Sequence, residues 1–135
     1  MAMDISAVME GLRVRLATIS DLNVYAYMPA RIPVPAAAVG FPDRLDYDET
    51  FGRGADRATF PVHVFVQYAE NESATDEIIG YMNGSGVGSV KAAIEAETTL
   101  GGAASFAVVN EAEVEVWEIA GVKYLAATFF VDVLA

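Results

Sequence analysis

The last third of the chain contains a run in which glutamates alternate with apolar residues, within 111–119, and a mainly apolar run, 122–131, separated by Ala120 and Gly121. A two-residue turn at this dipeptide fixes which residues of the two runs lie opposite each other. The expected pairs are Ile119–Val122, Trp117–Tyr124, Val116–Leu125, Glu115–Ala126, Val114–Ala127, Glu113–Thr128 and Ala112–Phe129. One face of this hairpin is apolar, and the other carries the carboxylate stripe, which is Glu111, Glu113 and Glu115. A slip of one residue would bury these carboxylates, so the sequence predicts an antiparallel hairpin of fixed register.

The composition is that of one folded domain that spans residues 1–135. Hydrophobic residues make up 54% of the chain and charged residues 20%, which is typical of globular proteins. The net charge of −11 repels phosphate and argues against specific nucleic-acid binding. There is no cysteine, which excludes disulfides, thiolate nucleophiles and sulfur-bound zinc.

The mean hydropathy of +0.35 is high, yet no apolar run reaches the roughly 18 residues that a membrane-spanning helix needs. The run from Tyr124 to Val131 ends at Asp132 and is typical of a buried strand. The surplus of apolar residues favours self-association. The first residues, MAMDIS, do not resemble a signal peptide, so we expect the protein in the cytoplasm.

The rest of the chain predicts an α+β fold. The expected elements, in chain order, are a helix at 4–17, strands at 24–28, 36–47 and 58–68, and helices at 73–82 and 89–97. Asp4 and Ser73 are the expected helix N-caps, and Ser89 is expected to start the helix at 89–97. Pro61 predicts an edge position or a bulge for the strand at 58–68. We expect a mixed or antiparallel β-sheet that packs against two to three helices on one face.

Three features bear on catalysis or phosphate binding, and none predicts a catalytic site or a cofactor. His63 is the only histidine and lies within a strand, where a structural role is the main interpretation and a lone general base the alternative. Gly84, Gly86 and Gly88 lack the spacing of a phosphate-binding loop and indicate a flexible joint between helices. The carboxylate stripe places its acids about 7 Å apart, as in glycosidases, but alternating acids are what an exposed strand face requires.

A fourth feature, an acidic cluster, bears on metal binding. It consists of Asp43, Asp46, Asp48 and Glu49, and it has no calcium-loop pattern. Nearby arginines favour ion pairing with these acids or with a partner chain, and weak binding of calcium or magnesium is the alternative.

The segment from Leu45 to Arg57, LDYDETFGRGADR, interrupts two strand-like runs and is too long for a tight turn. It combines acids, aromatic residues, glycines and arginines, and Arg and aromatic residues dominate the binding energy of interfaces. The sequence therefore predicts an extended hairpin arm, here called the arm segment, that orders against a neighbouring chain; a solvated loop is the alternative. The expected interface residues are Asp46, Tyr47, Asp48, Glu49, Phe51, Arg53, Asp56 and Arg57.

Four stretches resemble, in their order, the tail terminator (tail completion, minor tail) proteins of long-tailed phages, in particular those of actinobacterial phages and prophages. They are MDISAVMEGLRVRL, YDETFGRGADRATFPVHVFV, GSGVGSVKAAIEAETTLGG and GVKYLAATFFVDV, which together cover nearly the whole chain. None is a catalytic signature, so the resemblance lies in their succession.

The resemblance implies a structural virion assembly protein and no enzyme. Such a protein forms a hexameric ring on the tail tube, stops tube polymerisation and offers a surface to the head-tail connector protein. It acts at the head-tail junction of the virion after assembly in the host cytoplasm, and DNA passes through its lumen without specific binding. A head-to-tail stopper or adaptor protein is one alternative, and a small ligand- or cation-binding domain is another.

Overall fold

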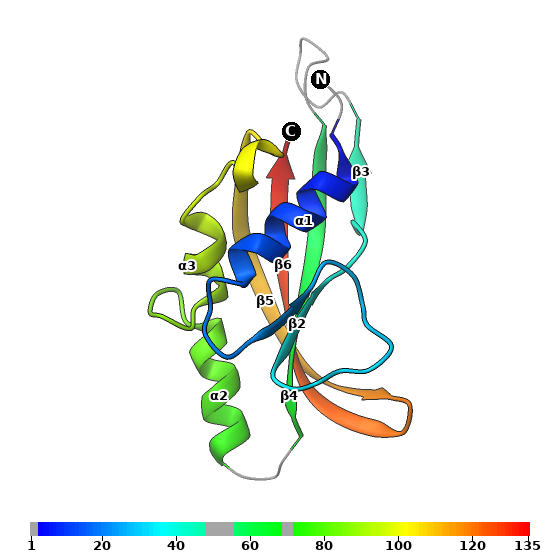
Figure 1. The fold of residues 1–135 in the computed structure, drawn as a ribbon, viewed down its shortest axis with the longest axis vertical. Helices are drawn as coiled ribbons and strands as arrows, with labels where there is room; N and C mark the ends of the chain where they lie inside the picture. Colours follow the sequence, from blue (N-terminus) through cyan, green and yellow to red (C-terminus); the bar gives the residue numbers. More distant parts are fainter. Residues whose placement is uncertain (1–2, 48–55, 69–71) are drawn as a thin grey trace.

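The computed structural model describes residues 3–47, 56–68 and 72–135, which form a six-stranded sheet and three α-helices (Figure 1). The strands are β1 (Asn23–Tyr25), β2 (Ala36–Val39), β3 (Arg44–Asp46), β4 (Arg57–Gln67), β5 (Phe106–Ile119) and β6 (Val122–Leu134). The helices are α1 (Ile5–Leu16), α2 (Glu72–Met82), α3 (Val90–Glu95) and the short 3-10 turn η1 (Leu100–Gly102). The strand order is β1-β2-β4-β6-β5, and β3 pairs with β4 beside the end of β2. β1 and β2 are parallel and the other pairs antiparallel, so the expected α+β fold with a mixed sheet is confirmed.

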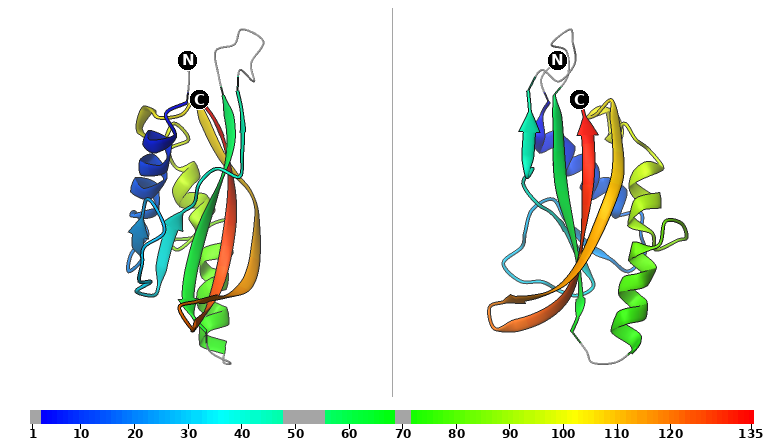
Figure 2. Two further views of the ribbon diagram at one scale, coloured as in Figure 1. Left: turned by 90° about the vertical axis from the view of Figure 1, so that its right-hand side faces the viewer. Right: turned by 180° about the vertical axis from the view of Figure 1, so that it is seen from behind.

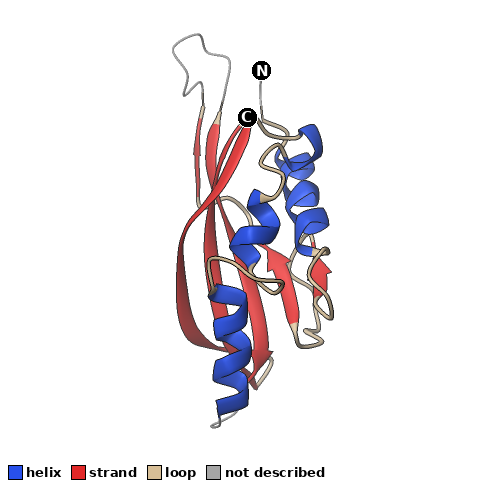
Figure 3. Cartoon of the chain, turned by 90° about the vertical axis from the view of Figure 1, so that its left-hand side faces the viewer, coloured by secondary structure: helices blue, strands red, loops and turns tan. Residues whose placement is uncertain are grey.

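The helices lie on one face of the sheet, as predicted (Figure 3). Alternate residues of β4, among them Phe60, Val62 and Val64, point to this face and are fully buried. From α1, Val8 and Leu12 fill the same core. A smaller apolar cluster lies on the opposite face, where Phe65 packs among Ile32, Ala36 and Ala126.

The predicted N-cap Asp4 and the predicted helix start at Ser89 are confirmed. The Asp4 carboxylate accepts a hydrogen bond from Ala7 N at 3.1 Å, and the Ser89 hydroxyl accepts one from Ala92 N at 3.1 Å. The prediction for Ser73 is wrong, because α2 begins at Glu72 and includes Ser73 in its first turn. A capping pattern fixes the start of a helix only to within one or two residues.

The predicted strand at 36–47 is two strands, and the predicted edge position of Pro61 is wrong. β4 is central, with β2 and β3 on one side and β6 on the other. The strand pairing is interrupted between β2 and β3, opposite Pro61, where Gly40 N donates to Pro61 O at 2.7 Å. A Cβ on Gly40 would lie 2.8 Å from the ring of Pro61, so glycine is required at this close approach. The irregularity that proline predicts therefore lies in the neighbouring strand.

The predicted register of the C-terminal hairpin is confirmed pair by pair from Ile119–Val122 to Ala112–Phe129. Ala120 and Gly121 both have positive φ, 53° and 79°, which is the type I′ turn that matches strand twist. The prediction that one face is apolar is right from Ala112 to Val116 and wrong near the turn, where Glu118 and Lys123 pair on the same face. The apolar part of this face is buried only in part. Ala127 is buried, whereas Val114 and Val116 on the same face are 45% and 51% exposed. The hairpin end curves away from α2, so the helix does not cover it (Figure 2).

Candidate functional site

The base of the arm segment is a short antiparallel pair at one end of the sheet. Arg44 lies opposite Thr59, and Asp46 lies opposite Arg57, which closes β3 and β4 into a hairpin. Of the predicted interface residues, four lie outside the described residues: Asp48, Glu49, Phe51 and Arg53. The other four, Asp46, Tyr47, Asp56 and Arg57, fall at this base.

Asp56 is buried, with an exposed fraction of 7%, and it forms hydrogen bonds with Met3 and Ala135. Its carboxylate accepts a hydrogen bond from Met3 N at 2.9 Å. Its backbone N–H and C=O pair with Ala135 at 2.6 Å and 2.9 Å. Tyr47, in contrast, is 72% exposed and is available to a partner.

The charged residues at the base form two ion pairs on the helix-free face of the sheet. Arg44 Nε lies 3.1 Å from Asp46 Oδ2, and Arg57 Nε lies 3.5 Å from Asp132 Oδ1. Together with Thr59 and Asn110, they line a polar hollow of about 310 Å³. The sequence prediction did not include Asp132; a single acid in an otherwise apolar strand was the signal for it. Arg44 thus pairs with Asp46 of the acidic cluster, as predicted, and Arg57 pairs with Asp132, which lies outside that cluster.

An apolar groove of about 650 Å³ lies beside α1. It is lined by Ile5, Ser6, Met9, Glu10, Ala26, Tyr27 and Phe41. Tyr27 is 71% exposed and Phe41 80%, so both rings present most of their surface to solvent. The sequence does not indicate this groove, because its residues come from three separate segments that only the fold brings together.

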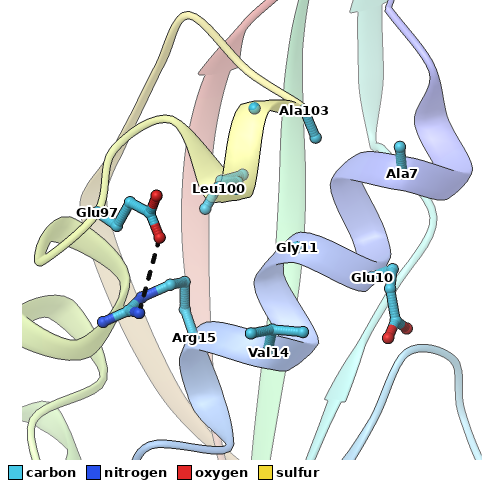
Figure 4. Close-up of a pocket in the computed structure, with 10 residues that line it drawn as sticks. Ala7, Glu10, Gly11, Val14, Arg15, Glu97, Leu100 and Ala103 are labelled. Carbon is cyan, nitrogen blue, oxygen red and sulfur yellow. Dashed lines mark ion pairs between the residues drawn. The ribbon is translucent and has the colours of Figure 1, made fainter.

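A second groove, of about 480 Å³, lies between α1 and η1 (Figure 4). Gly11 and Val14 line one wall and Leu100 the other, while Arg15 reaches toward Glu97, with 3.9 Å between Nη1 and Oε2. Arg15 Nε also donates to Ala93 O at 3.0 Å, so its guanidinium is engaged within the fold. The wall is mainly apolar, and the close packing of α1 against η1 accounts for its shape.

His63 lies on the helix-free face in an aromatic cluster. Its Nδ1 is 2.9 Å from Thr128 Oγ1, and its ring centroid is 4.7 Å from that of Trp117. Burial lowers the pKa of His63 below 6.5, although the charges of Asp43 and Glu115 oppose the shift. These contacts give the histidine a role in packing the sheet face.

The other candidates are placed as follows. The glycine joint at 83–89 connects α2 to α3, and Ser89 Oγ donates to Asn83 O while it caps α3, so its hydroxyl serves the fold. From the acidic cluster, Asp43 and Asp46 are described, and within the described ranges no three His, Asp or Glu side chains lie close enough to hold a metal ion. None of the described helices is long and apolar enough to cross a bilayer.

In comparisons with known proteins, no protein-family model matches the sequence and no curated protein matches it either. The resemblance to tail terminators is therefore carried by the quoted segments alone.

Proposed function

We propose that this protein is a structural virion assembly protein, a ring-forming tail terminator that works by docking to other protein chains. In this role it caps the tail tube, stops its polymerisation and provides the surface that joins the tail to the head. Its partners would be further copies of itself, the tail-tube protein and the head-tail connector protein.

The observation that carries the proposal is a group of exposed aromatic side chains around β3. Phe41 precedes β3 and is 80% exposed, Tyr47 follows it and is 72% exposed, and Tyr27, which shares the groove with Phe41, is 71% exposed. Aromatic residues are enriched at the buried centres of protein interfaces, because they cover much apolar area with few rotatable bonds.

The charges around this group fit an interface that another chain completes. Arg44, which forms an ion pair with Asp46 at the base of the arm segment, has a side chain that is 76% exposed. This side chain lines the polar hollow. Exposed ion pairs contribute little to the stability of a single chain but set the register of a partner. In the proposed ring, the arm segment reaches the neighbouring subunit from this end of the sheet. One of the acidic faces of the protein would line the lumen, where its charge prevents DNA from adhering.

The first test is the assembly state of the purified protein, measured by native mass spectrometry and negative-stain imaging over a range of concentrations. The proposal expects rings with six-fold symmetry, alone or with tail-tube protein added. A protein that stays monomeric in both conditions would contradict it. Capture by the portal protein and not by the tube protein would instead indicate a head-to-tail stopper.

The second test locates the interface. Phe41→Ala with Tyr47→Ala, and separately Phe51→Ala with Arg53→Ala, should weaken assembly and leave the monomer folded. Val87→Ala is the control, because Val87 is a fully exposed apolar residue in the joint between α2 and α3, away from β3. Assembly that falls equally in the control would show that the arm region has no special role.

A further inference from the structure

The strand β5 forms one edge of the sheet, and within the described residues β6 is its only strand neighbour. At its start this edge is closed by side chains. Val109 N donates to Glu95 Oε2 at 2.9 Å, and Lys91 Nζ donates to Val109 O at 3.2 Å. Burial opposes ionisation of Glu95, but the hydrogen bonds from Lys91 and Val109 outweigh it and lower the pKa of Glu95. Side chains of α3 thus satisfy the backbone of Val109 where a neighbouring strand would otherwise pair.

Beyond the bulge between Val109 and Glu111, no described side chain forms a comparable pair of hydrogen bonds with the edge backbone. The type I′ turn makes Ile119–Val122 a hydrogen-bonded pair, and such pairs alternate along an antiparallel ladder. The backbone N–H and C=O of Val114 and Val116 therefore point away from β6, in the plane of the sheet. Both valine side chains are about half exposed, at 45% and 51%. An outward row of backbone groups of this kind is a template for an additional strand.

The two faces of this edge differ in chemistry, and the difference specifies a partner. The carboxylate stripe of Glu111, Glu113 and Glu115 is exposed on one face, and Val114 and Val116 lie on the other. A strand laid against the edge would place alternate side chains beside the carboxylates and beside the valines. Favourable pairing requires basic residues beside the carboxylates and aliphatic residues beside the valines.

We propose that the outer edge of β5, from Glu111 to Val116, docks an extended segment of another protein in which Lys or Arg alternates with aliphatic residues. A second copy of β5 is a poor occupant, because it would bring two carboxylate stripes side by side. The net charge of −11 also opposes self-pairing at this edge. This inference goes beyond the proposed ring and uses a different surface, so the failure of one leaves the other standing.

The probe is a short fluorescent peptide in which lysine alternates with valine, matched in length to residues 111–116. Binding is followed by anisotropy and by the emission of Trp117, which lies in β5. A peptide of the same composition with its lysines and valines in separate blocks is the control for charge alone. We expect the alternating peptide to bind at least about tenfold more tightly than the block peptide. Equal affinity would overturn the proposal, because charge attraction without strand pairing would explain it.

Two sets of variants test the charges and the backbone separately. Glu113→Lys with Glu115→Lys should weaken binding of the lysine peptide by at least about tenfold and create affinity for a glutamate–valine peptide. Val114→Pro with Val116→Pro should abolish binding, since proline removes the outward N–H groups and leaves the ladder to β6 intact. Val114→Thr with Val116→Thr keeps those N–H groups and should still bind.

Circular dichroism checks that the proline variants fold. If they do not fold, a peptide N-methylated along one edge repeats the test on the unmodified protein, and it should bind about tenfold more weakly. If a peptide methylated along one of its edges and a peptide methylated along the other both bind as tightly as the unmethylated peptide, pairing through the backbone is refuted. Self-association of the unmodified chain that Val114→Pro removes would also refute it, because a second copy would then be the occupant.

Discussion

Gly11 lies in the middle of α1, where alanine would ordinarily stabilise a helix by about 0.5–1 kcal/mol. The packing of α1 against η1 reverses this expectation. A Cβ on Gly11 would lie 2.7 Å from Leu100 O and 2.9 Å from Leu100 Cβ, closer than real atoms pack. Leu100 is buried and has a positive φ of 50°, so its backbone has little freedom to move. Overpacking costs about 1–3 kcal/mol, and we expect Gly11→Ala to lower the free energy of unfolding by about 1–2 kcal/mol.

Gly80→Ala is the matched control, because Gly80 also lies inside a helix, α2, but no atom lies within 4 Å of its added Cβ. This variant should raise the free energy of unfolding by about 0.5–1 kcal/mol. Both changes are measured by urea unfolding, at a concentration where the assembly state is the same for all variants. A Gly11→Ala variant as stable as Gly80→Ala would show that α1 and η1 do not pack as described.

Three further predictions concern His63, the carboxylate stripe and Asp56. Because the pKa of His63 is lowered in the fold, the imidazole of the unfolded chain binds a proton more tightly than that of the folded chain. The contribution of the neutral, buried His63 to stability is therefore complete above about pH 6.5 and falls as the pH decreases below that value. The stability difference between the unmodified chain and His63→Gln should shrink over that range; a constant difference would contradict the burial of His63. Glu113→Ala and Glu115→Ala should each change the free energy of unfolding by less than about 0.5 kcal/mol, because both side chains are exposed and the hydrogen bond from Trp117 Nε1 to Glu115 Oε1 lies at the surface. A loss of several kcal/mol in chemical unfolding would mean that these carboxylates are buried. Asp56→Ala removes the acceptor of Met3 N and should cost about 1–3 kcal/mol by the same measurement, while Asp56→Asn, which retains an acceptor, should cost less.

The sequence predicts best where the pattern is local. The register of the C-terminal hairpin follows from a period of two and a turn at Ala120, and the start of α1 follows from one capping residue, Asp4. The break between β2 and β3 could not be predicted. It depends on the contact of Gly40 with the ring of Pro61, which lies in a strand that is distant in sequence.

The candidate surfaces were predictable only in part, and for a related reason. Composition marks the arm segment, but the exposure of Phe41 and Tyr27 depends on which elements fold over them. Likewise, alternation assigns Val114 and Val116 to the apolar face without showing how far along the hairpin the helices extend. The exposure of a side chain depends on which neighbouring elements cover it, and the sequence of a single strand does not determine this.

The contacts of Asp56 gather both ends of the described chain, Met3 and Ala135, at the end of the sheet where β3 and β4 form the base of the arm (Figure 1). The Ala120-Gly121 turn lies at the opposite end. A tag, a fluorophore or a surface tether fixed near residue 3 or residue 135 would therefore crowd Tyr47 and leave the outer edge of β5 accessible. A label inserted at the turn would do the reverse. The choice of attachment point thus decides which of the two docking surfaces a binding measurement can report.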